Sequence, residues 1–403
     1  MQYWQKTKQM KSRQAETGNI VSTVREFFSF LSRTLGLCPS RLLFLLVVLV
    51  LFVFQLAQAD DSAVKNSRDS TQGYTRIISS DQSSRESVLY YTLRNHTGKQ
   101  TIDEYYGDLR DQPHTGLCEV QIRPTSYKEI TSRLPFYVSD TNKEVMTLKE
   151  FSEEKLWKAF DNAADESEDN KVVLFVHGYN IDFVKGCNRA AIFQQALDEH
   201  SRLMLFSWPS KGELVSYTRD EADIEWSQQY LEPVIDRLSR IYGPERLNIV
   251  AHSLGSRGVF RVMQLLSRKD DRKHVNELVL LAPDIDADVF RAAFPDLKKA
   301  AHRITLYSSE NDQPLRVSHE VHGNPRLGEA GENLVVIKGM DTIDVSISGG
   351  REFTGHLYHL YNDIVRADLG LLLSNGKETS KRPNLKMLHK DGLPYWMLLP
   401  VQE

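Results

Sequence analysis

Residues 247–257 read Leu-Asn-Ile-Val-Ala-His-Ser-Leu-Gly-Ser-Arg, which is a buried-strand pattern, one serine and then a helix pattern. This order is typical of a nucleophile elbow, a tight turn that holds a serine hydroxyl at the edge of a sheet. Such a turn is strained, so it requires small residues on either side of the serine. Gly255 meets this requirement, and Ala251 stands where glycine is usual. The stretch therefore predicts Ser253 as a nucleophile.

A second motif lies upstream, where residues 171–176 (Lys-Val-Val-Leu-Phe-Val) form a strand pattern that runs directly into His177-Gly178-Tyr179-Asn180. Serine hydrolases with this strand order place one backbone donor of their oxyanion hole in such a turn and the other just after the nucleophile. Two fixed N–H groups stabilise the negative charge of an acyl-transfer transition state. The predicted donors are the N–H groups of Tyr179 and Leu254, and Gly178 would allow close approach.

Apolar segments alternate with helical patterns along most of the chain. Strands are expected at residues 88–93, 118–122, 172–176, 203–206, 247–250, 277–281, 304–307 and 333–337. Helices are expected at residues 189–199, 220–242, 254–267, 288–300 and 356–373. This alternation predicts an α/β fold with a mostly parallel, doubly wound sheet flanked by helices. About 20 residues separate Asp284 from Arg303, enough for one helix but not for a cap domain.

Six short motifs occur in the order that is found in one known group of proteins. They are residues 176–180 (Val-His-Gly-Tyr-Asn), 206–210 (Phe-Ser-Trp-Pro-Ser), 251–257 (Ala-His-Ser-Leu-Gly-Ser-Arg), 282–284 (Ala-Pro-Asp), 307–312 (Tyr-Ser-Ser-Glu-Asn-Asp) and 355–356 (Gly-His). Over about residues 115 to 375 the chain thus resembles the α/β-hydrolase superfamily and, within it, a bacterial family formerly described as a domain of unknown function. The resemblance implies the α/β-hydrolase fold and gives no substrate.

A serine needs a base, and in this fold the chain order is serine, acid, histidine. His356 is the predicted base because it follows the last expected strand and a glycine-rich turn, whereas His359 is read as a packing or surface histidine. Asp312, in the loop after the strand at 304–307, is the predicted orienting acid. Asp284, after the preceding strand, is the alternative acid, and its other predicted role is an ion pair with Arg257.

Trp208 follows the strand at residues 203–206, so its loop is expected at the carboxyl edge of the sheet, where ligands bind. Two roles are open for this side chain. It could form a wall of a substrate-binding acyl pocket, or it could belong to the core, as buried aromatic residues often do.

The amino-terminal part reads as an export segment. Residues 42–54 are an uninterrupted run of 13 apolar residues, which is short for a membrane span and suits a signal-peptide core. Ala57-Gln58-Ala59 supplies a small-x-small cleavage site, and the preceding segment is basic. Cleavage after Ala59 is the favoured prediction, and an uncleaved anchor that associates with the membrane through residues 42–57 is the alternative. Either one places the enzyme across the cytoplasmic membrane, in the periplasm or cell envelope.

Composition bounds the remaining properties. The 403 residues carry a net charge of −4, and without the basic residues 1–59 the remainder carries −9. Nucleic-acid binding therefore has no support. Cys38, Cys118 and Cys187 lack metal-site spacing, and a bridge between Cys118 and Cys187 is as plausible as two free thiols. The expected organisation is a leader at 1–59, a linker at 60–86, the α/β-hydrolase domain at 87–375 and a tail at 376–403.

The predicted function is that of an exported serine hydrolase, foremost a carboxylesterase, that acts on a small-molecule or surface-displayed acyl group. Ser253, His356 and Asp312 form the predicted catalytic triad, and neither a metal nor an organic cofactor is expected. The enzymatic alternative is an amidase or an acyltransferase with the same triad. The non-enzymatic alternative is a catalytically silent hydrolase fold that binds a partner.

Overall fold

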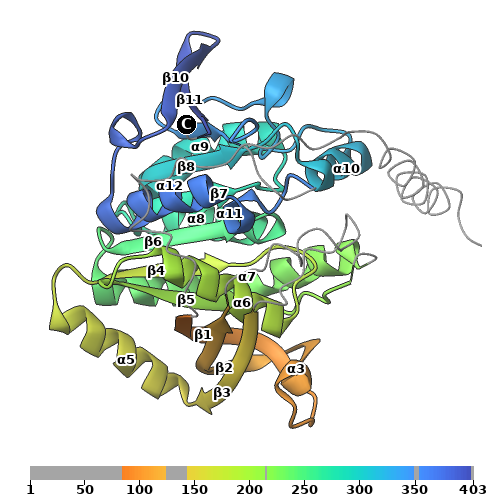
Figure 1. The fold of residues 1–403 in the computed structure, drawn as a ribbon, viewed down its shortest axis with the longest axis vertical. Coiled ribbons are helices and arrows are strands. Elements are labelled where there is room, and N and C mark those ends of the chain that lie inside the picture. The colour runs from red at the N-terminus through yellow and green to blue at the C-terminus, as the bar shows by residue number, and fades with distance from the viewer. Residues whose placement is uncertain (1–83, 124–142, 214–215, 349–353, 401–403) are drawn as a thin grey trace, which may run out of the picture. The chain divides into compact units, whose positions relative to one another are not determined.

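The computed structural model describes residues 84–123, 143–213, 216–348 and 354–400, and an 11-stranded sheet runs through them (Figure 1). The strand order across the sheet is β10-β11-β9-β8-β7-β6-β4-β5-β1-β2-β3. The strands are β1 (Ser84–His96), β2 (Tyr106–Ile122), β3 (Lys143–Phe151), β4 (Lys171–Val176), β5 (Ser201–Ser207), β6 (Leu247–His252), β7 (Val275–Leu281), β8 (Ala301–Ser308), β9 (Asp341–Asp344), β10 (Leu385–Lys390) and β11 (Leu393–Leu398).

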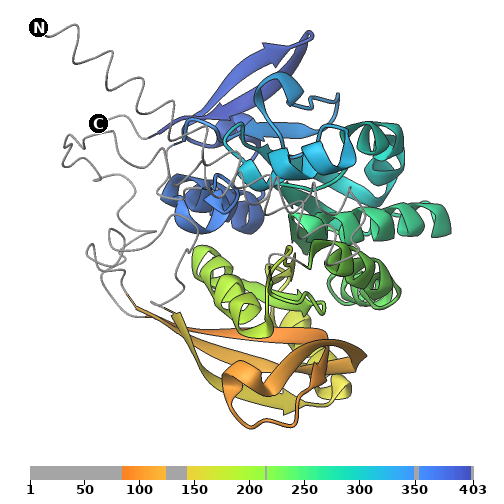
Figure 2. The same cartoon turned by 90° about the vertical axis from the view of Figure 1, so that its right-hand side faces the viewer.

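The central strands run parallel and are covered on both faces by helices (Figure 2). Strand β4 is apolar after its first residue, Lys171, because both of its faces are buried in this arrangement. One face packs against α5 (Glu153–Glu166), α7 (Tyr217–Tyr242), α8 (Leu254–Lys269) and α9 (Ala287–Ala300). The other face packs against α6 (Phe183–Ala196), α11 (Tyr358–Tyr361) and α12 (Asp363–Asn375). The predicted doubly wound α/β-hydrolase fold is confirmed, and the described chain between β7 and β8 holds α9 as its only helix.

Two antiparallel additions extend the parallel core at opposite ends of the sheet. Strands β1, β2 and β3 form a meander that joins the core where β1 pairs in parallel with β5 (Figure 2). Strands β10 and β11 form a hairpin whose second strand pairs with β9. The segment predicted as a tail therefore belongs to the sheet. Its first part was not recognisable as a strand, because the burial of β10 alternates only weakly.

The strand predicted at residues 333–337 is absent, and β9 lies a few residues later. Leu334 and Val335 are buried, which explains the apolar pattern. Their backbone is not paired as a strand; instead Thr342 in β9 donates its hydroxyl to the carbonyl of Val335 at 2.9 Å. The apolar pattern at residues 333–337 therefore predicted the burial of these side chains correctly, but the predicted strand conformation was wrong.

The helix predicted at residues 356–373 is broken into α11 and α12. Asn362 lies between them in an extended conformation, and its side chain accepts hydrogen bonds from the N–H groups of Ile364 and Val365. Asparagine is a strong N-cap, so it starts a new helix rather than continuing the old one. His356 consequently lies in the loop before α11 and does not open a helix.

A disulfide joins Cys118 in β2 to Cys187 in α6, with Cα atoms 6.4 Å apart. Both residues are buried in the core on the α6 side of the sheet. Of the two states that the sequence left open, the structure has the bridged one. The bond fastens the antiparallel meander to the helix that follows β4.

The predicted leader, residues 1–59, and almost all of the predicted linker lie outside the described residues. No helix within the described ranges has the length and apolar character needed to cross a membrane.

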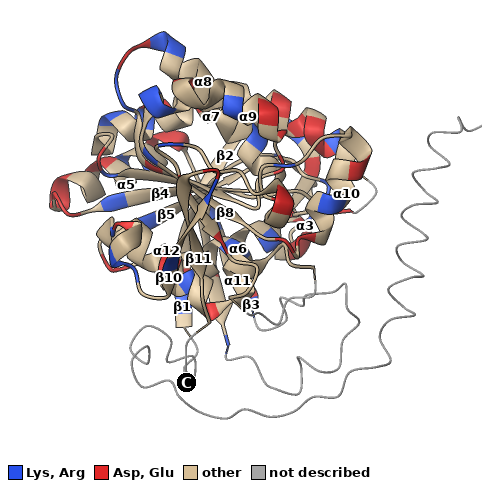
Figure 3. Cartoon of the chain, turned by 90° about the horizontal axis from the view of Figure 1, so that it is seen from above, with Lys and Arg blue, Asp and Glu red and all other residues tan. Residues whose placement is uncertain are grey.

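Lys and Arg residues are interspersed with Asp and Glu residues on the helices seen in Figure 3.

The disulfide is expected to contribute substantially to stability. The two cysteines are 69 residues apart in sequence, and closing a loop of that length in the unfolded chain corresponds to about 4 kcal/mol in the chain-entropy model. Reduction should therefore lower the melting temperature of the full chain, measured by circular dichroism. The Cys118→Ala/Cys187→Ala double variant should have a lower melting temperature that does not change when reductant is added. Cys38→Ala should have the melting temperature of the wild type and the same response to reductant. Two freely titrating thiols at positions 118 and 187 in unreduced protein would contradict the bond.

Candidate active site

Ser253 lies in the turn between β6 and α8 and has a strained backbone. Its φ is 50° and its ψ is −124°, a conformation that non-glycine residues rarely adopt. The turn is held on both sides, since the N–H of Ser253 donates to the carbonyl of Leu281 at 2.9 Å and its carbonyl accepts from the N–H of Asp284 at 3.2 Å. These bonds tie the turn to the carboxyl end of β7, and the geometry is that of a nucleophile elbow.

The turn after β4 lies directly against the elbow. A Cβ atom added to Gly178 would lie 2.9 Å from the Cβ of Ser253 and 2.7 Å from Nδ1 of His252. A Cβ atom added to Gly255 would lie 2.2 Å from the carbonyl oxygen of His177. Real Cβ atoms are not found so close to other atoms, so glycine is required at both positions. The structure thus brings Gly178, Tyr179 and Leu254 to the turn that holds Ser253.

The two predicted oxyanion-hole donors, Tyr179 and Leu254, lie in different parts of the fold. Tyr179 is in the loop after β4, and Leu254 begins α8. Leu254 is the first residue of α8, and N–H groups in the first turn of a helix have no acceptor within the helix. Tyr179 precedes Asn180, whose φ of 60° turns the chain sharply. The phenol of Tyr179 donates to the carbonyl of Glu213 at 3.1 Å, and its ring meets Tyr217 edge-on at 5.3 Å.

His356 and Asp312 form a direct pair. Nδ1 of His356 lies 2.8 Å from Oδ2 and 3.0 Å from Oδ1 of Asp312. The carboxylate cannot donate when it is ionised, so we assign the Nδ1–H tautomer to His356, which leaves Nε2 as an acceptor. The imidazole side chain is 12% exposed and the carboxylate is fully buried. Asp312 is also the N-cap of α10 (Gln313–His322), because its Oδ1 accepts from the N–H of Leu315.

Gly355 places the loop that carries His356. Its φ is 67°, and a Cβ atom at this position would lie 2.2 Å from the carbonyl oxygen of Asn311, next to Asp312. The loop before α11 therefore packs closely on the loop after β8. This contact explains how two segments more than 40 residues apart in sequence present their side chains to each other.

His252 connects this pair to the elbow. It precedes Ser253, its ring centroid is 4.7 Å from that of His356, and its Nε2 lies 3.3 Å from the carbonyl oxygen of His356. On its other side it contacts His359, which stacks on Phe193. Burial lowers the pKa of His252 and of His359 well below the usual range, so both imidazoles are neutral. Of the packing and surface roles that the sequence left open for His359, the structure gives the packing one.

Asp284 has different partners from those of Asp312. Its Oδ1 accepts from Nε of Arg326 at 2.8 Å and from the hydroxyl of Ser318 at 2.7 Å, and its Oδ2 accepts from the phenol of Tyr217. Arg257 reaches only its main-chain oxygen, at 3.4 Å, so the predicted carboxylate–Arg257 pair is corrected to a pair with Arg326.

The charge of Asp284 is compensated where it is buried. Burial raises its pKa, but Arg326, Arg257 and the two hydroxyl donors bring the net pKa below the usual value. Folding lowers the pKa, so the carboxylate stabilises the fold above the unfolded pKa, and this stabilisation is lost as the pH falls through the folded pKa. No histidine contact to this carboxylate is present among the described hydrogen bonds and ion pairs.

Trp208 supports the turn after β4 and does not face an opening. Its side chain is fully buried, its ring stacks on His177 with centroids 5.0 Å apart, and its Nε1–H donates to the carbonyl of His177 at 2.8 Å. It therefore has no exposed surface with which to form a pocket wall. Of the two predicted roles, the structure gives the core one.

Two residues with supporting roles escaped the sequence analysis. Arg94 in β1 is 1% exposed and donates to the carbonyls of Ile181 and Ser210, at 2.6 and 2.8 Å. Burial lowers the pKa of Arg94 to about 10 against the opposing effect of nearby carboxylates, so it remains charged at neutral pH. Asp220 in α7 accepts from the Ser210 hydroxyl at 2.5 Å and from the N–H of Asn180 at 3.4 Å.

Together, Arg94 and Asp220 hold the loops after β4 and β5 in place. Asp220 is the fourth residue of α7 and is fully buried. An arginine that continues the apolar strand at 88–93 was the only signal in the sequence for the first of them. Nothing in the sequence pointed to Arg326 as a partner of Asp284.

A match to a family model agrees with this architecture. The family model described as "Alpha/beta hydrolase of unknown function (DUF900)" matches residues 152–370. None of the curated proteins matches the chain. An esterase from the archaeon Pyrobaculum calidifontis is 10% identical, with a TM-score of 0.31 over 55% of this chain and 91% of that one. A carboxylesterase from Bacillus subtilis is 12% identical, with a TM-score of 0.31 over 56% of this chain and 100% of that one.

Proposed function

The chain belongs to the alpha/beta hydrolases of unknown function (DUF900), and from that premise we propose that it is a serine hydrolase that cleaves carboxylic esters through an acyl-serine intermediate. The observation that carries the proposal is the meeting of three loops at the carboxyl edge of one sheet. The strained turn at Ser253, the glycine turn at Gly178 and the His356–Asp312 pair come together there.

In the proposed reaction the hydroxyl oxygen of Ser253 attacks the ester carbonyl carbon, and Nε2 of His356 takes the hydroxyl proton. The carbonyl π electrons move to the oxygen and give a tetrahedral intermediate. As the C–O bond to the alcohol breaks, His356 returns the proton to the departing alcohol oxygen. Water then repeats the sequence on the acyl-serine, which releases the carboxylic acid and restores the serine.

Asp312 keeps His356 oriented through this cycle. Its two oxygens both accept from Nδ1, which fixes the imidazole tautomer and stabilises the imidazolium that forms. The negative charge on the former carbonyl oxygen is assigned to the N–H groups of Leu254 and Tyr179. Because these donors belong to turns that are fixed by packing, no reorganisation is needed when the charge develops.

An ester needs less help from the general acid than an amide does. The alcohol oxygen is a good enough leaving group to accept its proton from His356 as the C–O bond breaks, whereas an amide nitrogen must be protonated before the C–N bond breaks. An amidase and an acyltransferase would use the same side chains and differ in the leaving group or in the acceptor. Comparison of turnover on matched ester and amide substrates, with and without added alcohol, separates these three activities. A catalytically silent hydrolase fold would turn over neither the ester nor the amide.

The first prediction concerns the nucleophile. Wild-type protein should react covalently with a fluorophosphonate probe and hydrolyse a short activated ester, because only an activated serine reacts quickly with either. Ser253→Ala should do neither while it keeps the wild-type circular dichroism spectrum. Ser256→Ala changes a buried serine in α8, the helix that follows Ser253, and should keep the labelling, so it is the matched control. Equal labelling of wild type and Ser253→Ala would remove Ser253 from the role of nucleophile.

The second prediction compares two buried aspartates. Asp312→Asn should lower kcat by about 10⁴, as loss of the orienting acid does in other triads, because the amide favours the wrong imidazole tautomer. Asp284→Asn should instead lower the melting temperature, since breaking a buried pair costs about 3–5 kcal/mol, and the folded protein should keep most of its turnover. Both quantities are measured on both variants. The opposite pattern would move the triad role to Asp284.

We also propose that the protein is exported. The apolar run at residues 42–54 followed by Ala57-Gln58-Ala59 supports this, and the Cys118–Cys187 disulfide is of the kind that persists in oxidising compartments. The carboxylesterase would then meet small or surface-displayed acyl groups in the periplasm or cell envelope.

The third prediction tests this location. Amino-terminal sequencing of protein from a bacterial host should find Asp60 first, because cleavage follows the small-x-small site. Retention of residues 1–59 in a membrane fraction would identify an anchored enzyme instead. In both cases a protease added to spheroplasts should digest the hydrolase domain. Full protection until lysis would rule out export.

A further inference from the structure

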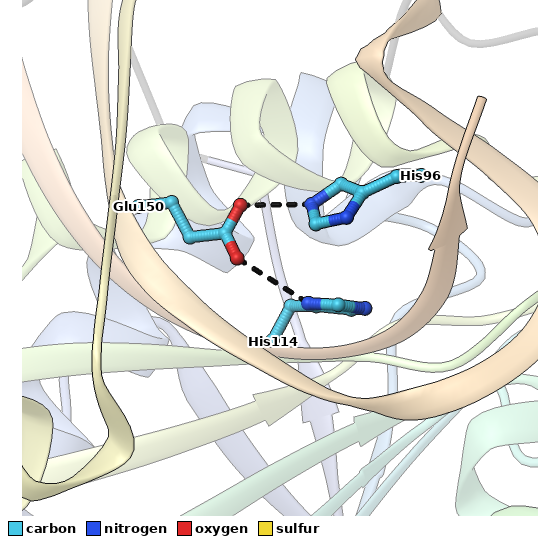
Figure 4. Close-up of side chains that lie close together, drawn as sticks. All are labelled: His96, His114 and Glu150. Carbon is cyan, nitrogen blue, oxygen red and sulfur yellow. Dashed lines mark hydrogen bonds and ion pairs between the residues drawn. The ribbon is translucent and has the colours of Figure 1, made fainter. Parts of the chain in front are cut away.

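Three potential metal ligands meet on the antiparallel meander. His96 is the last residue of β1, His114 lies in β2 and Glu150 lies in β3, and their ligand atoms all fall within 4.8 Å of one another. Nε2 of His96 is 2.8 Å from Oε2 of Glu150, and Nδ1 of His114 is 3.3 Å from Oε1. Figure 4 shows both imidazoles directed at the one carboxylate.

The sheet register creates this convergence. Glu150 pairs with Gly116, two residues from His114, so the two side chains are diagonal neighbours on one face of adjacent strands. His96 joins them because the pairing of β1 with β2 shifts twice between Thr92 and His96. Such irregularities bend a strand and redirect its side chains. Residues far apart in sequence thus present imidazole and carboxylate groups to one point.

The groups around the three ligands hold them in place. Nε2 of His114 lies 3.2 Å from Oδ2 of Asp111, so its second ring nitrogen is taken by a carboxylate. Metal-binding histidines commonly donate their other N–H in this way, which fixes the tautomer and the ring orientation. The phenols of Tyr105 and Tyr106 both donate to Oε2 of Glu150 at 3.1 Å.

We propose that His96, His114 and Glu150 bind one Zn²⁺ ion, with water as the fourth ligand. Zinc favours imidazole nitrogen and carboxylate oxygen in a tetrahedral arrangement. Ligand atoms about 2.0–2.1 Å from a tetrahedral zinc lie about 3.3 Å apart. The ligand atoms of His96, His114 and Glu150 already lie within 4.8 Å of one another, so side-chain rotations that move them by about 1 Å would admit the ion.

The ion has access from solvent, because the side chains of His96 and Glu150 are 38% and 31% exposed. It would join three neighbouring strands, and the first of these strands also carries Arg94, two residues before His96. Binding to the folded state alone stabilises that state by mass action. The site is separate from the acyl-transfer chemistry and does not rest on it.

Zinc binding by the full chain tests the proposal. Isothermal titration of metal-free protein with Zn²⁺ should show one saturable site, and His96→Ala and His114→Ala should each abolish it. Asp111→Asn should weaken binding by roughly 10- to 100-fold, as expected when the carboxylate that orients a metal-binding histidine is removed. His200→Ala, which changes an exposed histidine outside the cluster, should bind like wild type.

A second measurement avoids dependence on the variants. Co²⁺ in place of Zn²⁺ should give the intense visible bands of a four-coordinate site in wild-type protein, and added Zn²⁺ should remove them whereas Mg²⁺ should not. The weak spectrum of a six-coordinate ion would overturn the proposal. So would the absence of saturable Zn²⁺ binding, or binding that is equal in wild type, His96→Ala and His114→Ala.

Discussion

The close contact between the turn after β4 and the turn after β6 is the constraint on which the site depends. It exists because Gly178 and Gly255 have no side chains, and a Cβ atom at either would overlap neighbouring atoms by a wide margin. Once the two turns meet, Gly178 lies directly against Ser253, and the residues that follow these two positions, Tyr179 and Leu254, are carried with the turns. The strain at Ser253 is tolerated because hydrogen bonds to the end of β7 hold the turn from the other side.

Two charged side chains buried beside these turns are hydrogen-bonded to the loops that form them. Arg94 satisfies carbonyls of the loops after β4 and β5, and Asp220 accepts from the same two loops. A buried charge is costly unless it is paired and hydrogen-bonded, so such residues are informative about geometry. Here they fix the position of irregular backbone, which cannot satisfy itself as a helix or strand does.

Asp312 and Asp284 show how surroundings decide what a carboxylate does. Both are buried at the same edge of the sheet and both follow parallel strands. Asp284 faces an arginine, a tyrosine and a serine, so its charge is neutralised within the scaffold. Asp312 faces the imidazole of His356. Only the second arrangement leaves a group that can take and return a proton.

The sequence by itself determined the fold class, the position of the serine turn and the identity of the glycine turn, because these follow from local patterns: alternating strands and helices, and small residues where backbone strain requires them. It also ranked His356 and Asp312 first through chain order. Tertiary structure alone decided which partner Asp284 has, that Trp208 is core, that residues 385–398 extend the sheet and that His96, His114 and Glu150 converge. Each of these depends on pairing between segments distant in sequence, and strand register and loop packing are set by the whole core rather than by neighbouring residues.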